Sequence, residues 1–416
     1  MSRKVTIDFE KCRQCGFCSN TNVCYSPNTN VCYSPSRCTG CLSCYYACPY
    51  EARSIVIENI EPRFIRVYVD GVEYRVPEGV PVAEALRDYC GFIFADPSSS
   101  KPTLVCRTGG CWACALVIDG KLERTCITPV RDNMRVDTNI EHFKPLRIVH
   151  GPSPHKVGGK ATPWWEVDYV NYVEAAIWVA GCNLRCPQCQ NYHVTYDNFS
   201  KPLTPEEAAI AAVYCHRRYG TKGIAVSGGE PTINRRWLIE FFKEISRRIK
   251  PKVRRHLDSN GTILTHDYID QLIEAGCNNI GIEPKCLYVE TYMKITGISS
   301  RDLAEKYLET TWKAVEYIYE NYSNNVYLGV GLVYNKDLIS FDEIAEAGRR
   351  IVSIDKKIQV TVLDYFPTFR RRNIERPSIG EMLKIKEILE AQGLETVIVQ
   401  TIAGHIGPKK HRRIEL

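Results

Sequence analysis

Cysteines are the residues whose number and spacing point most directly to chemistry in this chain. There are 20 of them, and they gather in three groups, within residues 12–48, 106–126 and 182–189. Disulfide frameworks are typical of small secreted domains, whereas this chain has 416 residues and its grouped cysteines stand at two- to four-residue spacings. The spacing therefore predicts thiolates that bind metal clusters.

The first group contains two similar runs. Residues 38–49, CTGCLSCYYACP, have the C-x2-C-x2-C-x3-C-P spacing by which bacterial two-cluster ferredoxins hold 4Fe-4S clusters, and residues 12–18 repeat C-x2-C-x2-C. In such ferredoxins the fourth cysteine of a run binds the other cluster. The expected ligands are therefore Cys12, Cys15, Cys18 and Cys48 for one cluster, and Cys38, Cys41 and Cys44 with one further thiolate for the other.

The further thiolate must come from between the two runs, where an eight-residue tandem repeat contains two candidates. NTNVCYSP occurs at 20–27 and again at 28–35, which places Cys24 and Cys32 at equivalent positions. One of them is expected to be a ligand, and the repeat does not distinguish them. Zinc ribbons are the alternative for this segment, although runs that end in Cys-Pro do not have the paired spacing of a ribbon.

The second group has the plant-type 2Fe-2S spacing, C-x4-C-x2-C-x11-C. Its members are Cys106, Cys111, Cys114 and Cys126. Gly109 and Gly110 let the backbone pass closely round a cluster. Alternating β residues and the hairpin turns Asp70-Gly71 and Asp119-Gly120 surround the group, so residues 61–137 resemble a β-grasp 2Fe-2S ferredoxin domain. Structural zinc is the alternative.

The third group is the shortest, with Cys182, Cys186 and Cys189 in GCNLRCPQC at C-x3-C-x2-C. Three thiolates on a 4Fe-4S cluster leave one iron without a protein ligand. A catalytic metal centre needs an open coordination site of this kind, whereas an electron-transfer centre does not. The spacing therefore predicts a catalytic cluster.

The elements that must position this third group form an alternating series. Strands are expected at 174–180, 223–227, 253–258, 278–283, 326–333, 358–363 and 396–400. Helices are expected near 204–219, 235–249, 265–275, 302–321, 341–353 and 379–392. This alternation indicates a parallel sheet with crossover helices, and the motifs follow the strands, where α/β barrels keep their active sites.

The cysteine loop and a second motif together resemble the radical S-adenosylmethionine (SAM) superfamily over about residues 170–405. The second motif, SGGEP, follows the second expected strand. The resemblance implies an α/β fold with an incomplete parallel (βα)6-type barrel, and SAM whose amino and carboxylate groups chelate the open iron. It implies methionyl contacts by Ser227, Gly228, Gly229, Glu230 and Pro231. A simple turn is the alternative for an isolated Gly-Gly-Glu.

Within that superfamily the chain looks most like the pyruvate formate-lyase activating enzyme group. Asp258, Ser259 and Asn260, followed by Gly261, match its Asp-Thr-Asn-Gly segment and are expected to contact SAM. Lys285 falls at the lysine of its Asp-x-Lys motif and is a candidate catalytic residue. A helix cap at Asp258 and a surface ion pair at Lys285 are the structural alternatives.

Two positions depart from the pattern of that group. Gln188 stands where the family has an aromatic residue that contacts the adenine, so that contact is not expected here. Glu283 replaces an aspartate, which affects the cation site that the family builds near this position and Asp258.

Four cysteines lie outside the groups. Cys90, Cys215 and Cys277 are expected to pack as small hydrophobic residues. Cys286 follows Lys285 at a strand end, so it faces either the active site or the core.

Two further segments have alternative interpretations. Residues 401–408, TIAGHIGP, either close over a substrate or form a C-terminal turn. Residues 370–372, all arginine, and the basic tail KKHRR either bind an acidic partner or form a solvated basic face.

Composition sets outer limits on the function. Apolar residues are 44% and charged residues 25%, values typical of globular protein, and the net charge of +6 permits nucleic acid as a partner without indicating it. No run of eighteen apolar residues or signal-peptide pattern occurs, so we expect no membrane association and a cytoplasmic location.

The sequence therefore predicts four segments: a two-cluster 4Fe-4S ferredoxin-like domain (1–60), a 2Fe-2S domain (61–137), a linker (138–168) and a radical SAM domain (169–416). The leading hypothesis is a radical SAM oxidoreductase that cleaves SAM to a 5'-deoxyadenosyl radical and activates a glycyl radical enzyme. Three 4Fe-4S clusters and one 2Fe-2S cluster are expected, with the accessory clusters passing electrons from a protein donor. Modification of a small metabolite or RNA base, and a non-catalytic electron carrier, are the alternatives.

Overall fold

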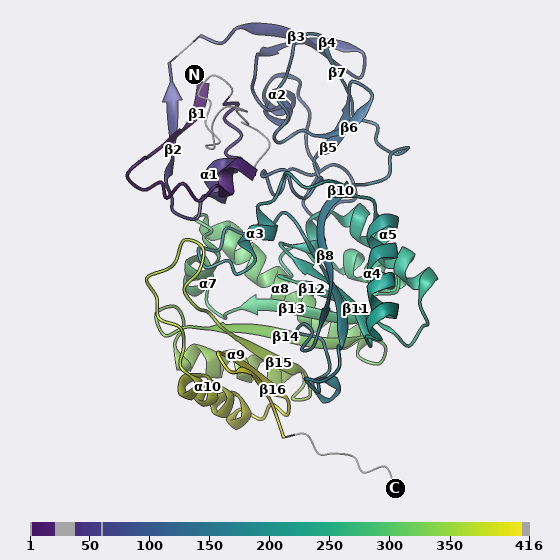
Figure 1. Ribbon diagram of the computed structural model, residues 1–416, viewed down its shortest axis with the longest axis vertical. Helices are drawn as coiled ribbons and strands as arrows, with labels where there is room; N and C mark the ends of the chain where they lie inside the picture. Colours follow the sequence, from purple (N-terminus) through teal and green to yellow (C-terminus); the bar gives the residue numbers. More distant parts are fainter. Residues whose placement is uncertain (1, 21–37, 60, 410–416) are drawn as a thin grey trace.

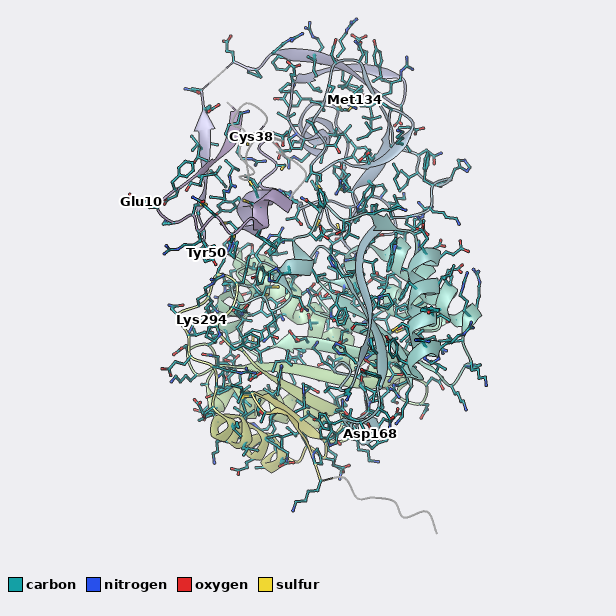
Figure 2. The ribbon with its side chains drawn as sticks, in the orientation of Figure 1. Glu10, Cys38, Tyr50, Met134, Asp168 and Lys294 are labelled. Atoms are coloured by element: carbon teal, nitrogen blue, oxygen red, sulfur yellow. The ribbon has the colours of Figure 1, made fainter. Side chains whose placement is uncertain are left out.

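The structure, a computed structural model, describes residues 2–20, 38–59 and 61–409. Figure 1 shows two small N-terminal modules packed on one end of a larger α/β domain. Cys38 marks the first module and Met134 the second, while Lys294 and Asp168 belong to the large domain (Figure 2). Cys24 and Cys32 lie outside the described residues, so the structure does not distinguish between them.

The first module is built on an antiparallel strand pair, β1 (Ser2–Ile7) with β2 (Arg53–Glu58). Between them, the 3-10 helix η1 (Phe17–Asn20) and the short helix α1 (Ser43–Ala47) carry or flank the cysteine runs. Because this module has a small apolar core, with Val5, Cys38 and Cys44 buried in it, the cysteines themselves make up much of its interior.

The second module is a five-stranded mixed sheet of order β4-β3-β7-β5-β6 with one helix. Its elements are β3 (Phe64–Val69), β4 (Val72–Pro77), α2 (Val82–Tyr89), β5 (Ala115–Ile118), β6 (Lys121–Arg124) and β7 (Met134–Asp137). Both expected hairpins are confirmed, since Asp70-Gly71 joins β3 to β4 and Asp119-Gly120 joins β5 to β6. All four turn residues have positive φ, as two-residue turns of this type require. Cys90 packs partly buried against this module's core, as expected.

The large domain contains a ten-stranded sheet of order β10-β8-β9-β11-β12-β13-β14-β15-β16-β17. The seven consecutive strands from β9 to β16 in this order are parallel, and β8, β10 and β17 are antiparallel to their neighbours. The parallel strands are β9 (Glu174–Val179), β11 (Gly223–Gly228), β12 (Arg254–Ser259), β13 (Asn279–Lys285), β14 (Tyr327–Tyr334), β15 (Gln359–Asp364) and β16 (Val397–Thr401). All seven lie where the sequence predicted strands, one more than a (βα)6 unit contains.

Helices cross between these strands and cover the sheet (Figure 1). They are α3 (Tyr192–Thr195), α4 (Pro205–Tyr219), α5 (Arg235–Arg248), α6 (His266–Glu274), α7 (Val289–Thr296), α8 (Arg301–Tyr322), α9 (Phe341–Ile354) and α10 (Ile379–Ala391). Their starts are encoded locally. For example, Thr204 and Glu207 form a capping box at α4, and Ser378 and Glu381 form another at α10.

One strand lies inside the segment that was expected to be a linker. Residues 147–155 form β8 (Arg147–His155), which pairs with β9, and the short strand β10 (Pro202–Leu203) pairs with β8. The sheet of the large domain therefore begins before the expected boundary at residue 169. The sequence HGPSPH concealed this strand because Gly and Pro are unfavourable inside strands, and the pairing accordingly shifts register between His150 and Ser153.

The rest of the same segment enters the sheet interior. Residues 158–164 form a strap whose backbone is bound by side chains from several strands: Asn279 donates to the Ala161 carbonyl at 2.8 Å, and Gln359 donates to the Lys160 and Thr162 carbonyls at 2.8 and 2.9 Å. Gly281 and Gly329 lie directly beneath the strap, where a Cβ atom would meet it closer than normal contact. The strap is thus part of the folded core.

Within the described residues, every helix is too short or too polar to cross a membrane.

Candidate active site and cluster-binding sites

The third cysteine group lies in the loop that follows β9, beside a cavity of about 160 Å³. All three thiols line it, together with expected site residues of the next three strands, β11, β12 and β13. Those lining residues are Ser227, Gly228, Gly229, Glu230, Asp258, Ser259, Asn260 and Lys285. Segments separated by about a hundred residues therefore meet at one site, because parallel strands place their carboxyl ends at one edge of the sheet.

The two glycines of the SGGEP motif are required by close backbone contacts. A Cβ atom on Gly228, whose φ is +123°, would lie 2.3 Å from the Val179 nitrogen. A Cβ atom on Gly229 would lie 2.2 Å from the Gly181 carbonyl oxygen. The motif therefore lies flat against the start of the cysteine loop, and larger residues would push the two apart.

The Glu230 carboxylate joins the second and third strands of the site. It accepts hydrogen bonds from the Ser259 hydroxyl at 2.8 Å, the Asn260 backbone N–H at 2.7 Å, and the hydroxyl and N–H of Thr232 at 2.7 and 3.0 Å. Burial raises the pKa of Glu230 despite these bonds. Pro231 lies behind the cavity, where its carbonyl accepts a hydrogen bond from Arg147. Glu230 therefore fixes the shape of the site.

A network of buried charges lines the same cavity as the cysteines. The Lys160 ammonium, from the strap, lies 3.1 Å from Glu283 and 3.7 Å from Asp258, and Lys285 pairs with Glu283. Burial alone would raise the pKa of Asp258, but Lys160 and His256 together hold it well below its usual range. The Lys160 ammonium thus lies between Asp258 and Glu283, the two residues near which the family resemblance implies a cation site.

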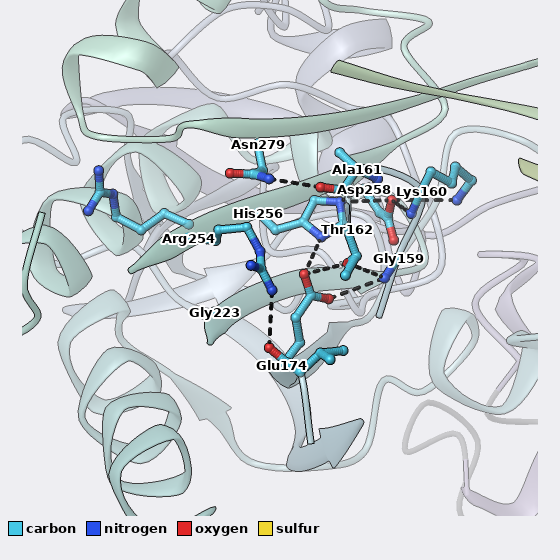
Figure 3. Close-up of polar contacts among 12 residues, drawn as sticks. Gly159, Lys160, Ala161, Thr162, Glu174, Gly223, Arg254, His256, Asp258 and Asn279 are labelled. Carbon is cyan, nitrogen blue, oxygen red and sulfur yellow. Dashed lines mark hydrogen bonds and ion pairs between the residues drawn. The ribbon is translucent and has the colours of Figure 1, made fainter. Parts of the chain in front are cut away.

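His256 extends this network to a second layer (Figure 3). Its Nδ1 lies 2.9 Å from Glu174 and its Nε2 lies 3.3 Å from Asp258, with both side chains of the His256–Glu174 pair fully buried. Burial would lower the pKa of His256, but the two carboxylates raise it to about 9. The imidazole is therefore held as a cation, which balances Glu174 and orients Asp258.

Lys285 stands in an unusual backbone conformation. It ends β13 with φ +73°, which is rare for a residue other than glycine, and the strand pairing shifts register there. Its ammonium also lies 3.4 Å from the Tyr365 hydroxyl. The surface-pair alternative for Lys285 is wrong because the residue is only 6% exposed, and the helix-cap alternative for Asp258 is wrong because Asp258 lies within β12.

Gln188 is buried at the position that the resemblance assigns to an aromatic residue. Its amide donates to the Ile295 carbonyl at 2.9 Å and accepts from Arg371 at 2.6 Å. The side chain therefore has polar partners on both sides and lines the cavity.

The second cysteine group forms a closed set of four buried thiols. The sulfur atoms of Cys106 and Cys111 are 3.0 Å apart, and the Cys126 thiol contacts those of Cys106 and Cys114. Four converging thiols, three from residues 106–114 and one that follows β6, fit a 2Fe-2S cluster, whose ligands are four thiolates. A Cβ atom on Gly110 would lie 2.5 Å from the Asp197 carbonyl oxygen, so the loop also lies tightly against the large domain.

The described cysteines of the first group follow the expected crossed pattern. Cys12, Cys15, Cys18 and Cys48 line one small cavity of about 30 Å³. Cys38 and Cys44 are buried together in the core of the first module, with Cys18 packed on them. Cys41 packs instead against Cys114 and Cys126 of the second group. The first and second groups are therefore neighbours, and the four thiols around the small cavity match the ligand set expected for the first cluster.

Other expected positions have structural roles. Arg370 donates to the carbonyls of Tyr45, Tyr46 and Cys48 at 2.6–3.0 Å, so this arginine joins the first module to the large domain and is neither a free basic face nor a docking site. Cys286 is buried, with its thiol 3.6 Å from the Tyr288 carbonyl, and Cys215 and Cys277 lie in the main core. Of the basic tail, residues 410–416 lie outside the described part.

The C-terminal segment 401–408 forms a hairpin. β17 (Gly404–Ile406) folds back on β16, and His405 lines a second cavity, of about 240 Å³, inside the sheet. This second cavity shares Lys160, Ser227 and Asp258 with the first. His405 therefore borders the interior of the site, although the segment itself is a turn.

Sequence reasoning missed three basic residues that organise the site. Lys160 came from a segment expected to be a linker. Arg147 is fully buried and donates to the carbonyls of Ala180 and Glu230, which joins the cysteine loop to the SGGEP motif. Arg185, inside the cysteine loop, contacts other modules. Lys160 and Arg147 belong to no motif, and Arg185 is a spacer residue between two cysteines of one, so only their tertiary contacts identify them.

Comparison with known proteins gives three family matches. The radical SAM superfamily matches residues 177–346, a 2Fe-2S iron-sulfur cluster binding domain matches 63–141, and a 4Fe-4S binding domain matches 31–54.

Individual relatives are more distant. A probable GTP 3',8-cyclase of Methanococcus aeolicus is 34% identical over 136 residues, which cover 32% of this chain and 43% of that protein. Another, of Pyrococcus abyssi, is 30% identical over 190 residues, covering 45% and 58%. A putative glycyl-radical enzyme activating enzyme of Methanocaldococcus jannaschii is 22% identical over 242 residues, covering 57% and 93%. The chain thus spans about half the length of these cyclases. A radical SAM domain therefore lies at residues 177–346, with matches to 2Fe-2S and 4Fe-4S binding domains ahead of it.

Proposed function

We propose that the chain cleaves SAM reductively to methionine and a 5'-deoxyadenosyl radical. One observation carries this proposal: the thiols of Cys182, Cys186 and Cys189 line the same cavity as the SGGEP motif and residues 258–260. A bound 4Fe-4S cluster with three thiolate ligands would have one iron free to chelate SAM. The role of the chain's own residues is to fix the cysteine loop through Gly228, Gly229 and Arg147 and to hold Asp258 and Lys285 as buried charges.

The accessory sites are proposed as an electron relay. The first module would hold two 4Fe-4S clusters, and the second, as a β-grasp domain, would hold one 2Fe-2S cluster, with residues 169–416 as a partial barrel. This gives about 14 iron atoms per chain when each site holds its usual cluster. The packing of Cys18 on Cys38 and Cys44, and of Cys41 on Cys114 and Cys126, supports a continuous path from a protein donor.

The substrate that we propose is a glycyl radical enzyme, from which the deoxyadenosyl radical would remove a glycine Cα hydrogen atom. The relative named as an activating enzyme supports this proposal because its match extends over 93% of its own length. Asp258 and Lys285, which follow the activating-enzyme pattern, lie together in the cavity.

A second candidate is a radical reaction on a small molecule such as a purine nucleotide. The relatives named GTP 3',8-cyclase support it through higher local identity, 30–34%, over shorter segments. The second cavity of about 240 Å³ beside the first would accommodate part of such a substrate.

The test uses anaerobically purified protein with its clusters reconstituted. The first measurement is 5'-deoxyadenosine formed from SAM with a chemical reductant; its absence would contradict radical SAM activity. The second compares a glycyl radical enzyme from the same genome with GTP as substrates. An organic radical signal from the former supports activation, whereas GTP-dependent consumption of SAM supports the alternative.

A further inference from the structure

One side chain inside the catalytic cysteine loop contacts all three cluster-binding segments. Arg185 lies between Cys182 and Cys186, and its Nη1 donates to the Cys182 carbonyl at 2.9 Å. Its Nη2 donates to the carbonyl of Cys106, in the second cysteine group, at 2.6 Å. The guanidinium carbon also lies 4.5 Å from the ring centre of Tyr46, which stands between Cys44 and Cys48.

The backbone of Arg185 is held as firmly as its side chain. Its N–H donates to the Thr296 carbonyl at 3.0 Å, and Gly297 packs so closely on its carbonyl that a Cβ atom there would lie 2.6 Å away. Thr296 and Gly297, which do not line the first cavity, thus hold the backbone of the cysteine loop. The guanidinium is therefore presented from a fixed point, and its planar fork can bind two carbonyls at once.

We propose that Arg185 is the positioning residue that couples the 2Fe-2S site to the catalytic cysteine loop, and that it sets the rate of electron delivery between them. The proposal rests on the proposed relay function. In the step concerned, one electron leaves the reduced 2Fe-2S cluster and reduces the catalytic cluster, and no covalent bond is made or broken.

Two physical effects follow from this placement. The guanidinium of Arg185 hydrogen-bonds the carbonyls of both Cys106 and Cys182, so this one rigid group fixes the distance between the two residues. Because both residues are expected cluster ligands, the distance between the two clusters depends on it. The positive charge also favours the more negative, reduced state of any cluster beside it, so its removal should shift both reduction potentials to more negative values.

The experiment compares three variants of the full-length, cluster-loaded protein. Arg185→Met keeps the apolar stem and removes the charge, while Arg185→Lys keeps the charge without the fork. Arg124→Met is the matched control. Arg124 donates to the carbonyls of Gly109 and Asn198, and so it also joins the second module to the large domain. These bonds do not involve the loop that carries Cys182, Cys186 and Cys189. Iron content, reduction potentials from redox titration followed by electron paramagnetic resonance, and the rate of reduction of the catalytic cluster are measured.

Arg185→Met is expected to retain its iron and to be reduced normally by a small chemical reductant. Its reduction by a reduced ferredoxin, used as protein donor, should slow by roughly tenfold or more, the usual effect of losing a hydrogen-bond partner of a metal ligand. Both potentials should fall. Arg185→Lys should restore the potentials but only part of the rate, and Arg124→Met should leave the potential of the catalytic cluster unchanged.

Several outcomes would overturn the proposal. Wild-type potentials and ferredoxin-driven rates in Arg185→Met would show that electrons pass elsewhere, for instance through the contact of Cys111 with Gly181. If Arg185→Met loses its iron, the test of the proposal rests on Arg185→Lys alone. A wild-type rate of ferredoxin-driven reduction in Arg185→Lys would contradict the role of the guanidinium fork, and a slower rate would support it. Absence of SAM cleavage in the wild type with chemical reductant would contradict the proposed function, but the potentials would still test Arg185.

Discussion

The second and third cysteine groups both present thiols in a loop, but their surroundings differ. Cys106, Cys111, Cys114 and Cys126 are all buried and touch one another. Cys182, Cys186 and Cys189 are partly exposed and line a cavity together with Asp258, Glu283, Lys160 and Lys285. The second group is therefore a closed set of thiols, and the third group is open on one side.

This difference separates two uses of the same ligand type. A closed set of four ligands leaves no position for a substrate and suits electron transfer, whereas an open set beside fixed charges suits chemistry on a bound molecule. The two loops nevertheless touch, through Gly181 against Cys111 and through Arg185. Substitutions on either side of this contact can test whether the distinction holds, beginning with the largest expected effect.

Replacing Cys182, Cys186 or Cys189 by Ala should abolish SAM cleavage with every reductant. The reason is that loss of a ligand at the open site removes the cluster position itself. Formation of 5'-deoxyadenosine is the measurement. Cys277→Ala is the matched control, because Cys277 is buried in the same domain away from the cavity, and it should keep its activity. Residual cleavage in all three variants would place the chemistry elsewhere.

Replacing Cys106, Cys111, Cys114 or Cys126 by Ser should have a conditional effect. Cleavage driven by a protein donor should be lost, since a relay cluster is missing, whereas a small strong chemical reductant should restore it. Cys90→Ala, in the same module but outside the cluster loop, should behave as wild type with both donors. Persistent inactivity of a well-folded Ser variant with chemical reductant would mean that the second module takes part in catalysis.

The sequence predicted the repetitive parts of this molecule well. The seven parallel strands have local signals, namely short apolar runs between helices with capping residues, and the cysteine spacings identify each cluster loop without tertiary information. Figure 3 shows what the sequence could not predict, since Glu174, His256 and Lys160 meet through tertiary packing alone. A buried ion pair joins two segments that are distant in sequence. A single lysine or histidine outside any motif gives no sign in the sequence that it will be buried in such a pair.

Strand β8 and the strap were missed for a related reason. Their Gly and Pro residues are those of a linker, yet a Cβ atom on Gly151 would lie only 3.0 Å from the Ala176 carbonyl oxygen, and Gly159 leaves room for the Asp258 side chain. Close approach of backbone to backbone requires small residues, so a tightly packed segment and a solvated one can have similar compositions.

The third prediction concerns Lys160, which distinguishes the open site from the closed one. Lys160→Met removes the ammonium shared by the buried carboxylates of Asp258 and Glu283, and leaves the group one positive charge short with His256 beside Asp258 and Lys285 beside Glu283. Removal of one member of a buried ion pair costs about 3–5 kcal/mol. The unfolding midpoint under anaerobic conditions should fall accordingly. Lys356→Met is the control, because Lys356 pairs with Glu395 on the surface at 2.9 Å and such pairs contribute about 1 kcal/mol or less.

Adding Glu283→Gln to Lys160→Met should recover part of the lost stability, since it removes the excess negative charge that Lys160→Met leaves in the buried group. Equal midpoints for Lys160→Met and Lys356→Met would show that the strap ammonium does not balance these carboxylates.

The smallest expected effect is a dependence of stability on pH that comes from His256. Glu174 and Asp258 raise the pKa of this imidazole from 6.5 to about 9, although burial acts in the opposite direction. Because the folded-state pKa is the higher one, the stabilisation is fully present below pH 6.5 and is lost as the pH rises through about 9. At 1.36 kcal/mol per pKa unit, it amounts to about 3 kcal/mol.

The free energy of unfolding of His256→Gln should therefore lie below that of wild type by about this amount at pH 6 and approach it at pH 10. His405→Gln is the matched control, because burial lowers the pKa of His405, the opposite direction from His256, so its effect on stability is not expected to be lost as the pH rises through about 9. If the difference between wild type and His256→Gln stays constant from pH 6 to pH 10, the imidazole is not a buried cation. The second layer of the open site would then be held by hydrogen bonds alone.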